Sequence, residues 1–143
     1  MELREELEQA VAVDDVARNR CCVQVTNELP EAWKIRIVGV GTTFFFQTNG
    51  SLNGQKEVVS RNTSLGYKGS TTYCTTQADK CVRRTYTVVV VQDDETGKQQ
   101  QYAAREDTGN NECFTFIPYT MAPTSGNREA AFHPDGLVLR RRG

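Results

Sequence analysis

The sequence has little of what usually points to a function: no long apolar run, no large excess of one charge and almost no histidine. Its 143 residues carry 17 basic and 18 acidic side chains, a net charge of −1 at pH 7, and one histidine. This balance argues against wholesale nucleic-acid binding, which usually uses a basic domain, so we expect no nucleic-acid partner. No apolar run approaches the roughly 20 residues that span a bilayer. The acidic N-terminus also differs from the basic-then-apolar pattern of a signal peptide.

Motifs that carry chemistry are scarce as well. The sole histidine, His133, has no Gly-x-Ser-x-Gly elbow to supply a nucleophile, and we expect it to be a loop residue. The sequence has no Cys-x-x-Cys pair, which argues against a structural zinc site. The carboxylates of residues 93–95 do not match a calcium-loop spacing, so a solvated hairpin tip is the better interpretation. We therefore expect no enzyme, no cofactor and no metal.

Five cysteines are present, and an odd number leaves one thiol free or bonded to another chain. Cys74 and Cys81 enclose six residues that could form the loop of a hairpin, so we predict a disulfide across its base. Cys21, Cys22 and Cys113 then remain without an assigned pairing. The alternative is that all five are reduced and pack as small apolar residues.

Residues 82–91 form the stretch around which we expect the fold to be organised. Their β-branched residues favour a pleated strand, with Tyr86, Val88 and Val90 on one face and Thr85, Thr87, Val89 and Val91 on the other. Because the strand is apolar on both faces towards its end, we expect both to be covered and Val88 and Val90 to lie in the core. Residues 93–97 are typical of a turn, and residues 99–105 return as a polar edge strand.

Shorter strand patterns flank this hairpin. Apolar and polar residues alternate over residues 21–29 and 33–38, and further strands are expected at 42–48, 56–60, 113–117 and 137–139. Glycine- or proline-rich stretches at 39–41, 66–73 and 118–135 are expected to bend the chain or form loops. About eight short strands predict a mostly β, single-domain antiparallel β-sandwich or jelly roll with an N-terminal α-helix. The expected units are a helical arm (1–20), a β-sandwich (21–139) and a basic tail (140–143).

The strongest helical pattern lies in residues 2–18, where Leu3, Leu7 and Val11 belong to one apolar stripe. Residues 2–20 hold six acidic and three basic side chains, a net charge of −3. An acidic helix is a poor ligand for anionic membranes, and a helix of this length is marginal alone in water. Docking on protein is therefore expected.

Two further features suggest contacts between chains. In the run of three phenylalanines, Phe45 must point away from Phe44 and Phe46, and helix 2–18, another subunit or lipid is needed to cover one of the two faces. The basic residues Arg140, Arg141 and Arg142 could meet phosphate, or the acidic helix of the same or a neighbouring chain. We assign these residues, with Leu3, Leu7 and Val11, to an assembly interface.

The amphipathic segment, followed by Val23-Gln24-Val25-Thr26-Asn27 and then Trp33, is loosely similar to actinoporin-type cytolysins. The cysteines depart from that family's pattern, and its aromatic-rich headgroup-binding surface is not visible in the sequence. The resemblance implies a β-sandwich that acts on lipid through an N-terminal helix.

Two functional hypotheses follow. The first is a non-enzymatic structural protein that self-assembles or decorates a larger particle or filament, such as a virion or phage component, with homo-oligomers or other structural proteins as partners. Its location would be a virion or an extracellular assembly. The alternative is a secreted lipid- or glycan-binding protein or a pore-forming cytolysin, and only this alternative involves a membrane.

Overall fold

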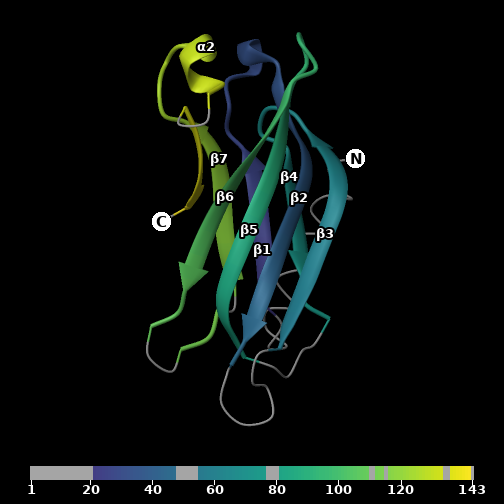
Figure 1. The fold of residues 1–143 in the computed structure, drawn as a ribbon, viewed down its shortest axis with the longest axis vertical. Coiled ribbons are helices and arrows are strands. Elements are labelled where there is room, and N and C mark those ends of the chain that lie inside the picture. The colour runs from purple at the N-terminus through teal and green to yellow at the C-terminus, as the bar shows by residue number, and fades with distance from the viewer. Residues whose placement is uncertain are drawn as a thin grey trace.

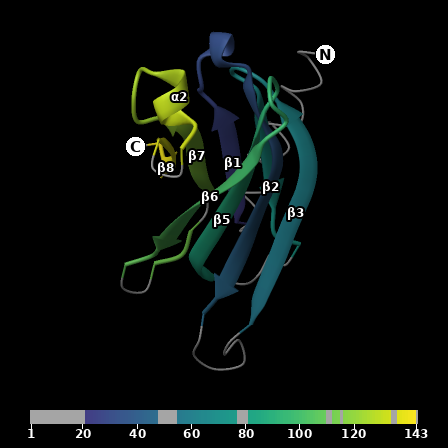
Figure 2. The same ribbon diagram turned by 45° about the horizontal axis from the view of Figure 1, so that its top comes forward.

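The fold consists of two four-stranded sheets packed face to face (Figures 1 and 2). A computed structural model describes residues 21–47, 55–76, 81–109, 112–114, 116–133 and 136–142. Sheet A has the spatial order β4 (Ser70–Cys74), β1 (Cys22–Asn27), β7 (Phe116–Pro123) and β8 (Leu137–Arg141). Sheet B has the order β3 (Lys56–Leu65), β2 (Ile35–Phe46), β5 (Val82–Asp93) and β6 (Gln99–Asp107). The predicted mostly β sandwich is confirmed.

Sheet A differs from the antiparallel expectation in one pair of strands. β1 and β7 run parallel, whereas the other described strand pairs of both sheets are antiparallel. Two short helical segments, η1 (Glu31–Trp33) and α2 (Arg128–Ala131), lie in connections at the same end of the sandwich (Figure 1). The predicted helix over 2–18, with Leu3, Leu7 and Val11, falls outside the described residues and stays a prediction.

The predicted central hairpin is formed by β5 and β6, and β6 is the polar edge strand expected. The assignment of Val88 and Val90 to the core is wrong. Side chains of β5 alternate between buried residues that face sheet A (Thr85, Thr87, Val89 and Val91) and residues on the outer face (Tyr86, Val88 and Val90). A strand that is apolar on both faces does not itself indicate which face is inside. Here the face with two threonines is the buried one.

These threonines are buried because tyrosines of sheet A bond to them. The Thr42 Oγ1 atom lies 2.7 Å from the Tyr73 hydroxyl and 2.9 Å from the Thr87 Oγ1 atom. Separately, the Tyr119 hydroxyl of β7 lies 3.2 Å from Thr85 Oγ1. We call these five side chains the polar chain; its two hydrogen-bonded groups join sheet B to β4 and to β7. Burial raises the pKa of Tyr73 to about 12, so its hydroxyl keeps its proton and can donate.

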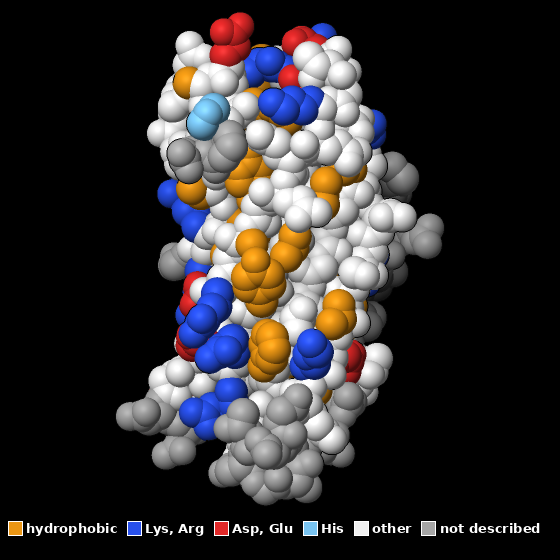
Figure 3. Space-filling model, viewed as in Figure 1, with side chains coloured by type: hydrophobic (Ala, Val, Ile, Leu, Met, Phe, Trp, Pro, Cys, Tyr) orange, Lys and Arg blue, Asp and Glu red, His pale blue; other side chains and the backbone are white. Residues whose placement is uncertain are grey.

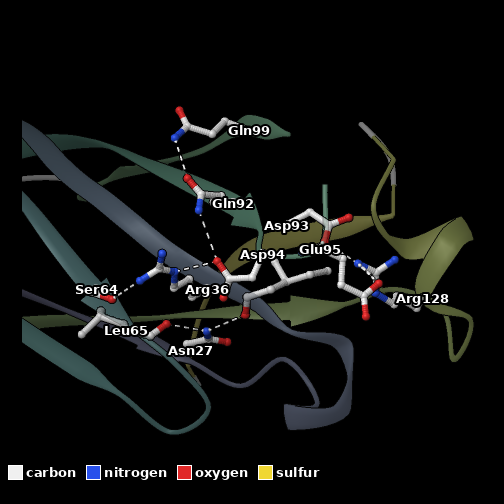
Figure 4. A network of polar contacts seen from close by, with 11 residues as sticks. Asn27, Arg36, Ser64, Leu65, Gln92, Asp93, Asp94, Glu95, Gln99 and Arg128 are labelled. Atoms are coloured by element: carbon white, nitrogen blue, oxygen red, sulfur yellow. Dashed lines mark hydrogen bonds and ion pairs between the residues drawn. The ribbon is translucent and has the colours of Figure 1, made fainter. Parts of the chain in front are cut away.

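Asn27, at the end of β1, makes a second connection between the sheets (Figure 4). Its side-chain amide donates to the Leu65 carbonyl at 2.8 Å and to the Ile35 carbonyl at 3.3 Å. Its Oδ1 atom accepts from the Leu29 N–H at 2.8 Å. Both amide protons and the oxygen are therefore used, which explains how this side chain can be completely buried.

The predicted Cys74–Cys81 disulfide is wrong. Cys74 instead bonds Cys22, which links β4 to β1, and Cys81 bonds Cys113. Cys74 ends a strand of sheet A, whereas Cys81 immediately precedes a strand of sheet B, so these two strands do not form the predicted hairpin. Cys21 is the remaining free thiol and is buried.

Several boundaries also differ from those predicted. β2 continues through the Gly-Val-Gly stretch, where a shift in register between Ile37 and Gly39 marks a bulge. β7 includes Pro118, although the stretch from residue 118 was expected to be irregular. The Pro118 carbonyl accepts from the Arg142 N–H at 3.0 Å. The stretch 66–73, expected to be a loop, contains most of β4. β8 extends to Arg141, so the expected boundary at residue 139 falls inside a strand.

The alternation of β5 generates a direct test. Val89→Asp should prevent folding, because a carboxylate in the apolar interior costs several kcal/mol out of a typical stability of about 5–15 kcal/mol. Val90→Asp, on the outer face, should change the free energy of unfolding by only about 1 kcal/mol. Urea unfolding followed by circular dichroism measures both variants. Equal loss of structure in the two variants would show that the side chain of Val90 is as buried as that of Val89.

The polar chain generates a second test. Thr42→Val should lower the free energy of unfolding by about 1–3 kcal/mol, because the Tyr73 hydroxyl loses a partner while remaining buried. Adding Tyr73→Phe should recover part of this loss, since the orphaned hydroxyl is then absent. Denaturant unfolding of the two single variants and the double variant completes the cycle. Additive losses would mean that the two side chains do not interact.

Candidate functional site

The side chains of sheet B that point away from sheet A form a broad face on one side of the molecule. Register across β3, β2, β5 and β6 aligns them in rows, with Thr43 opposite both Val58 and Tyr86, and Gly41 opposite both Ser60 and Val88. Val58 is 61% exposed and Tyr86 is 44% exposed. Figure 3 shows hydrophobic side chains gathered along the middle of this face. We call five of them the apolar stripe: Phe45, Val58, Tyr86, Val88 and Val90.

Two glycines of β2 deepen the face beside the stripe. Gly39 lies opposite Val90 and Gly41 lies opposite Val88. Because neither glycine has a side chain, the valines border a shallow depression of about 460 Å³. A Cβ atom on Gly41 would lie 3.1 Å from the Cβ of Ser60, so a larger residue would both fill this space and crowd β3. The depression is therefore a consequence of the Gly-Val-Gly sequence.

One end of the stripe is basic. The Arg84 guanidinium lies over the Phe45 ring, 5.8 Å from its centroid, and Lys56 is opposite Phe45 on the neighbouring strand. Asp107 accepts from Arg84 at 2.6 Å and from Arg105 at 2.9 Å. The hydrogen bonds from Arg105 and then Arg84 hold the pKa of Asp107 below its usual range. The three cations, Lys56, Arg84 and Arg105, and the carboxylate of Asp107 give this end of the stripe a net charge of +2. Figure 3 shows basic side chains at one end of the hydrophobic ones.

The other end of the stripe is polar and internally bonded (Figure 4). Gln99 donates to Gln92 at 3.0 Å, and Gln92 donates to Asp94 at 3.2 Å. Arg36 donates to Asp94 and to Ser64, both at 2.8 Å. This row crosses all four strands of sheet B, and its polar groups are bonded to one another. The apolar stripe ends at this row.

Behind that row, Arg128 of α2 fastens the β5–β6 turn to the rest of the sandwich. Its guanidinium pairs with Asp93 at 2.5 Å and Glu95 at 3.4 Å, and it donates to the Trp33 carbonyl at 2.8 Å. Burial alone would raise the pKa of Asp93. The hydrogen bonds from the Glu95 N–H and Arg128 outweigh that effect, so the pKa lies below its ordinary value.

The acidic turn is therefore only partly the solvated hairpin tip that we expected, because Asp93 is buried. All three of its carboxylates are paired with arginines, Asp94 with Arg36 and the other two with Arg128. Within the described ranges, no group of three or more histidine, cysteine, aspartate or glutamate side chains could hold a metal ion.

The predicted interface residues do not all come together. Phe45 lies on the apolar stripe of sheet B, whereas Arg140 and Arg141 belong to β8 of sheet A. Arg142 pairs with Glu28 at 3.4 Å. The structure therefore separates the phenylalanine from the basic residues grouped with it. Leu3, Leu7 and Val11 lie outside the described residues.

His133 is exposed, and its carbonyl accepts from the Tyr102 hydroxyl at 3.2 Å. This is the loop position expected for it. None of the helices in the described part of the chain is long and apolar enough to cross a membrane.

Tyr86, Val58, Val88 and Val90 are the surface residues that sequence reasoning missed. Two features of the sequence pointed to this surface: the alternating apolar residues of β5 and the two glycines, two positions apart, in β2. Interpreting them requires the register between the two strands, and the bulge after Ile37 shifts that register.

Comparisons with known proteins give only distant likenesses. No protein-family model matches the sequence, and no curated protein matches it either. The human-specific toxin intermedilysin aligns over 86% of this chain and 23% of its own, with 12% identity and a TM-score of 0.43. A disulfide-locked intermedilysin mutant solved with human CD59 aligns over 86% and 24%, with 13% identity and a TM-score of 0.41. The chain thus spans about a quarter of the length of these structures.

The Arg128–Asp93 pair generates a test of pH dependence. Because the folded pKa of Asp93 is lowered, its contribution to stability is fully present above the ordinary pKa of 3.8 and is lost as the pH falls through the folded value. Asp93→Asn should lower the free energy of unfolding at pH 7 by about 1.5–3 kcal/mol, as expected for a hydrogen bond to a charged group. The loss should shrink towards pH 2.

Asp94→Asn is the matched control. Its carboxylate pairs with Arg36 on the exposed outer face, and such surface pairs contribute at most about 1 kcal/mol. Denaturant unfolding at several pH values compares the two variants with the parent. A penalty for Asp93→Asn that is the same at pH 7 and pH 2 would contradict the assigned role of the charge.

Proposed function

We propose that this protein is a non-enzymatic structural module that self-associates, or joins a larger particle or filament, through the outer face of sheet B. The apolar stripe is the observation that carries this proposal. Its members occupy neighbouring positions on three strands, and clustered apolar side chains at a surface are typical of an interaction site. The internally bonded polar row at one end and the charged row at the other give the stripe the polar rim common at protein interfaces.

The rest of the described chain fits a structural role. Three of its buried polar side chains, Asn27, Thr42 and Thr85, make hydrogen bonds that join the two sheets. Its two disulfides suit an extracellular or virion location, because cytosolic thiols usually stay reduced.

A second candidate follows from the basic end of the stripe. Phe45, Arg84, Arg105 and Lys56 combine an aromatic ring with cations, a composition that suits an anionic lipid or glycan surface. The stripe continues well beyond this end into uncharged rows, with Val88 and Val90 beside the depression. For this reason we favour protein as the partner.

The test is the oligomeric state of a stripe variant. Tyr86→Asp should convert the assembled protein into a monomer without loss of β structure, because a carboxylate in a buried apolar contact is costly. Tyr67→Asp is the control: Tyr67 is 48% exposed, lies in the turn between β3 and β4 and is not part of the stripe. Size-exclusion chromatography with light scattering measures the mass of each.

Two results would count against the proposal. A parent protein that is monomeric at every accessible concentration would contradict self-association. Leakage or co-sedimentation of vesicles containing anionic phospholipid, abolished by Tyr86→Asp but not by Tyr67→Asp, would favour the lipid-binding alternative instead.

A further inference from the structure

We propose that the apolar stripe of one copy receives the N-terminal segment, residues 2–18, of a second copy of this chain. This inference rests on the proposed function and names the partner of the same surface.

The charges of the segment and the face are opposite. Residues 2–20 carry a net charge of −3, and the basic end of the stripe carries +2 through Lys56, Arg84, Arg105 and Asp107. Contact between two copies of the same face would place like charges together wherever their basic ends met. An acidic amphipathic segment avoids this repulsion and gains from the opposite charge.

The dimensions also agree. As a helix, residues 2–18 would be about 26 Å long. The rows of the outer face from Arg84 to Val90 extend over about 20 Å along β5. Leu3 and Leu7, four residues apart, would be separated by about 6 Å along the helix, close to the roughly 6.6 Å between Val88 and Val90 on the strand. A helix lying along β5 could therefore place its leucines against successive rows of the stripe.

For a helix that ends at Arg18, the connection within one chain is too short to reach this face. Cys21 pairs through its backbone with Thr75 and extends the sheet A side of the sandwich. The three steps from Arg18 to Cys21 span at most about 11 Å. The axis of a helix on the outer face of sheet B would lie at least about 15 Å from sheet A, given a sheet separation of about 10 Å and a helix radius of about 5 Å. A helix with this end would therefore come from another copy.

Such an exchange places a donor segment and an acceptor face on every chain. Two copies can satisfy each other reciprocally, or each copy can donate to the next in a ring or filament. Both arrangements are consistent with a structural module, and both need the same two surfaces.

The experiment uses the full chain with one substitution on each surface. Leu7→Asp should disrupt the donor and Tyr86→Asp the acceptor, so each variant alone should be monomeric by light scattering. An equimolar mixture should form a species of two-chain mass, because the intact segment of the Tyr86→Asp chain can dock on the intact face of the Leu7→Asp chain. Gln9→Asp, which adds the same charge on the opposite side of the helix, should assemble like the parent.

The possible failures are distinguishable. If Leu7→Asp assembles like the parent while Tyr86→Asp is monomeric, the face is an interface but the segment is not its ligand. If Tyr86→Asp assembles like the parent, the proposed function fails together with this inference. A mixture of the two monomeric variants that shows no two-chain species would also overturn docking in trans.

Discussion

The polar chain, in which threonines of sheet B bond tyrosines of sheet A, is the constraint on which the rest of the structure depends. Thr85 and Thr87 face inward because two tyrosines of sheet A bond them, directly or through Thr42. A shift of β5 by one residue would expose these threonines and bury Tyr86, Val88 and Val90 in their place. The tyrosine hydroxyls would then lose their partners in the interior, at a cost that favours the observed register. Because these polar contacts fix the inner face of β5, its apolar residues Tyr86, Val88 and Val90 lie on the outer face.

Other bonds hold the acceptor face in shape at one end of the sandwich. Asn27 ties β1 to the backbones of β2 and β3, and Arg128 ties α2 to the β5–β6 turn. These contacts fix three of the four strands that form the face. A surface held in this way can present the stripe and the depression beside Gly39 and Gly41 without ordering its backbone on binding, which lowers the entropic cost of association.

The β-sandwich could be predicted from the sequence because strand periodicity and turn chemistry depend on residues close together in the chain. The strand pattern of residues 82–91, the turn at 93–97 and the polar return strand were all predicted correctly. The disulfide pairing was not, because β4 and β5 belong to different sheets and do not form the hairpin that was expected. The same limit applies to the stripe: Val58, Tyr86 and Val88 become neighbours only through the register of three strands.

Choosing the inner face of β5 was the other step that local pattern could not supply. Valine-rich residues on both sides made either face suitable for the core, and threonine is usually the more exposed residue type. Only the hydroxyls of Tyr73 and Tyr119, distant in sequence, make the threonine face the interior one. Of the candidate site, sequence reasoning found Phe45 alone, because three adjacent phenylalanines cannot all face the same way.

Hydroxyl-radical footprinting of the full chain across a range of protein concentrations tests the central claim most directly. Tyr86 and Tyr67 are both exposed tyrosines in the single chain, but only Tyr86 belongs to the apolar stripe. We expect oxidation of Tyr86 to fall as the protein assembles, while oxidation of Tyr67 stays constant. Assembly with unchanged oxidation of Tyr86 would contradict the assignment of the outer face of sheet B as the contact surface.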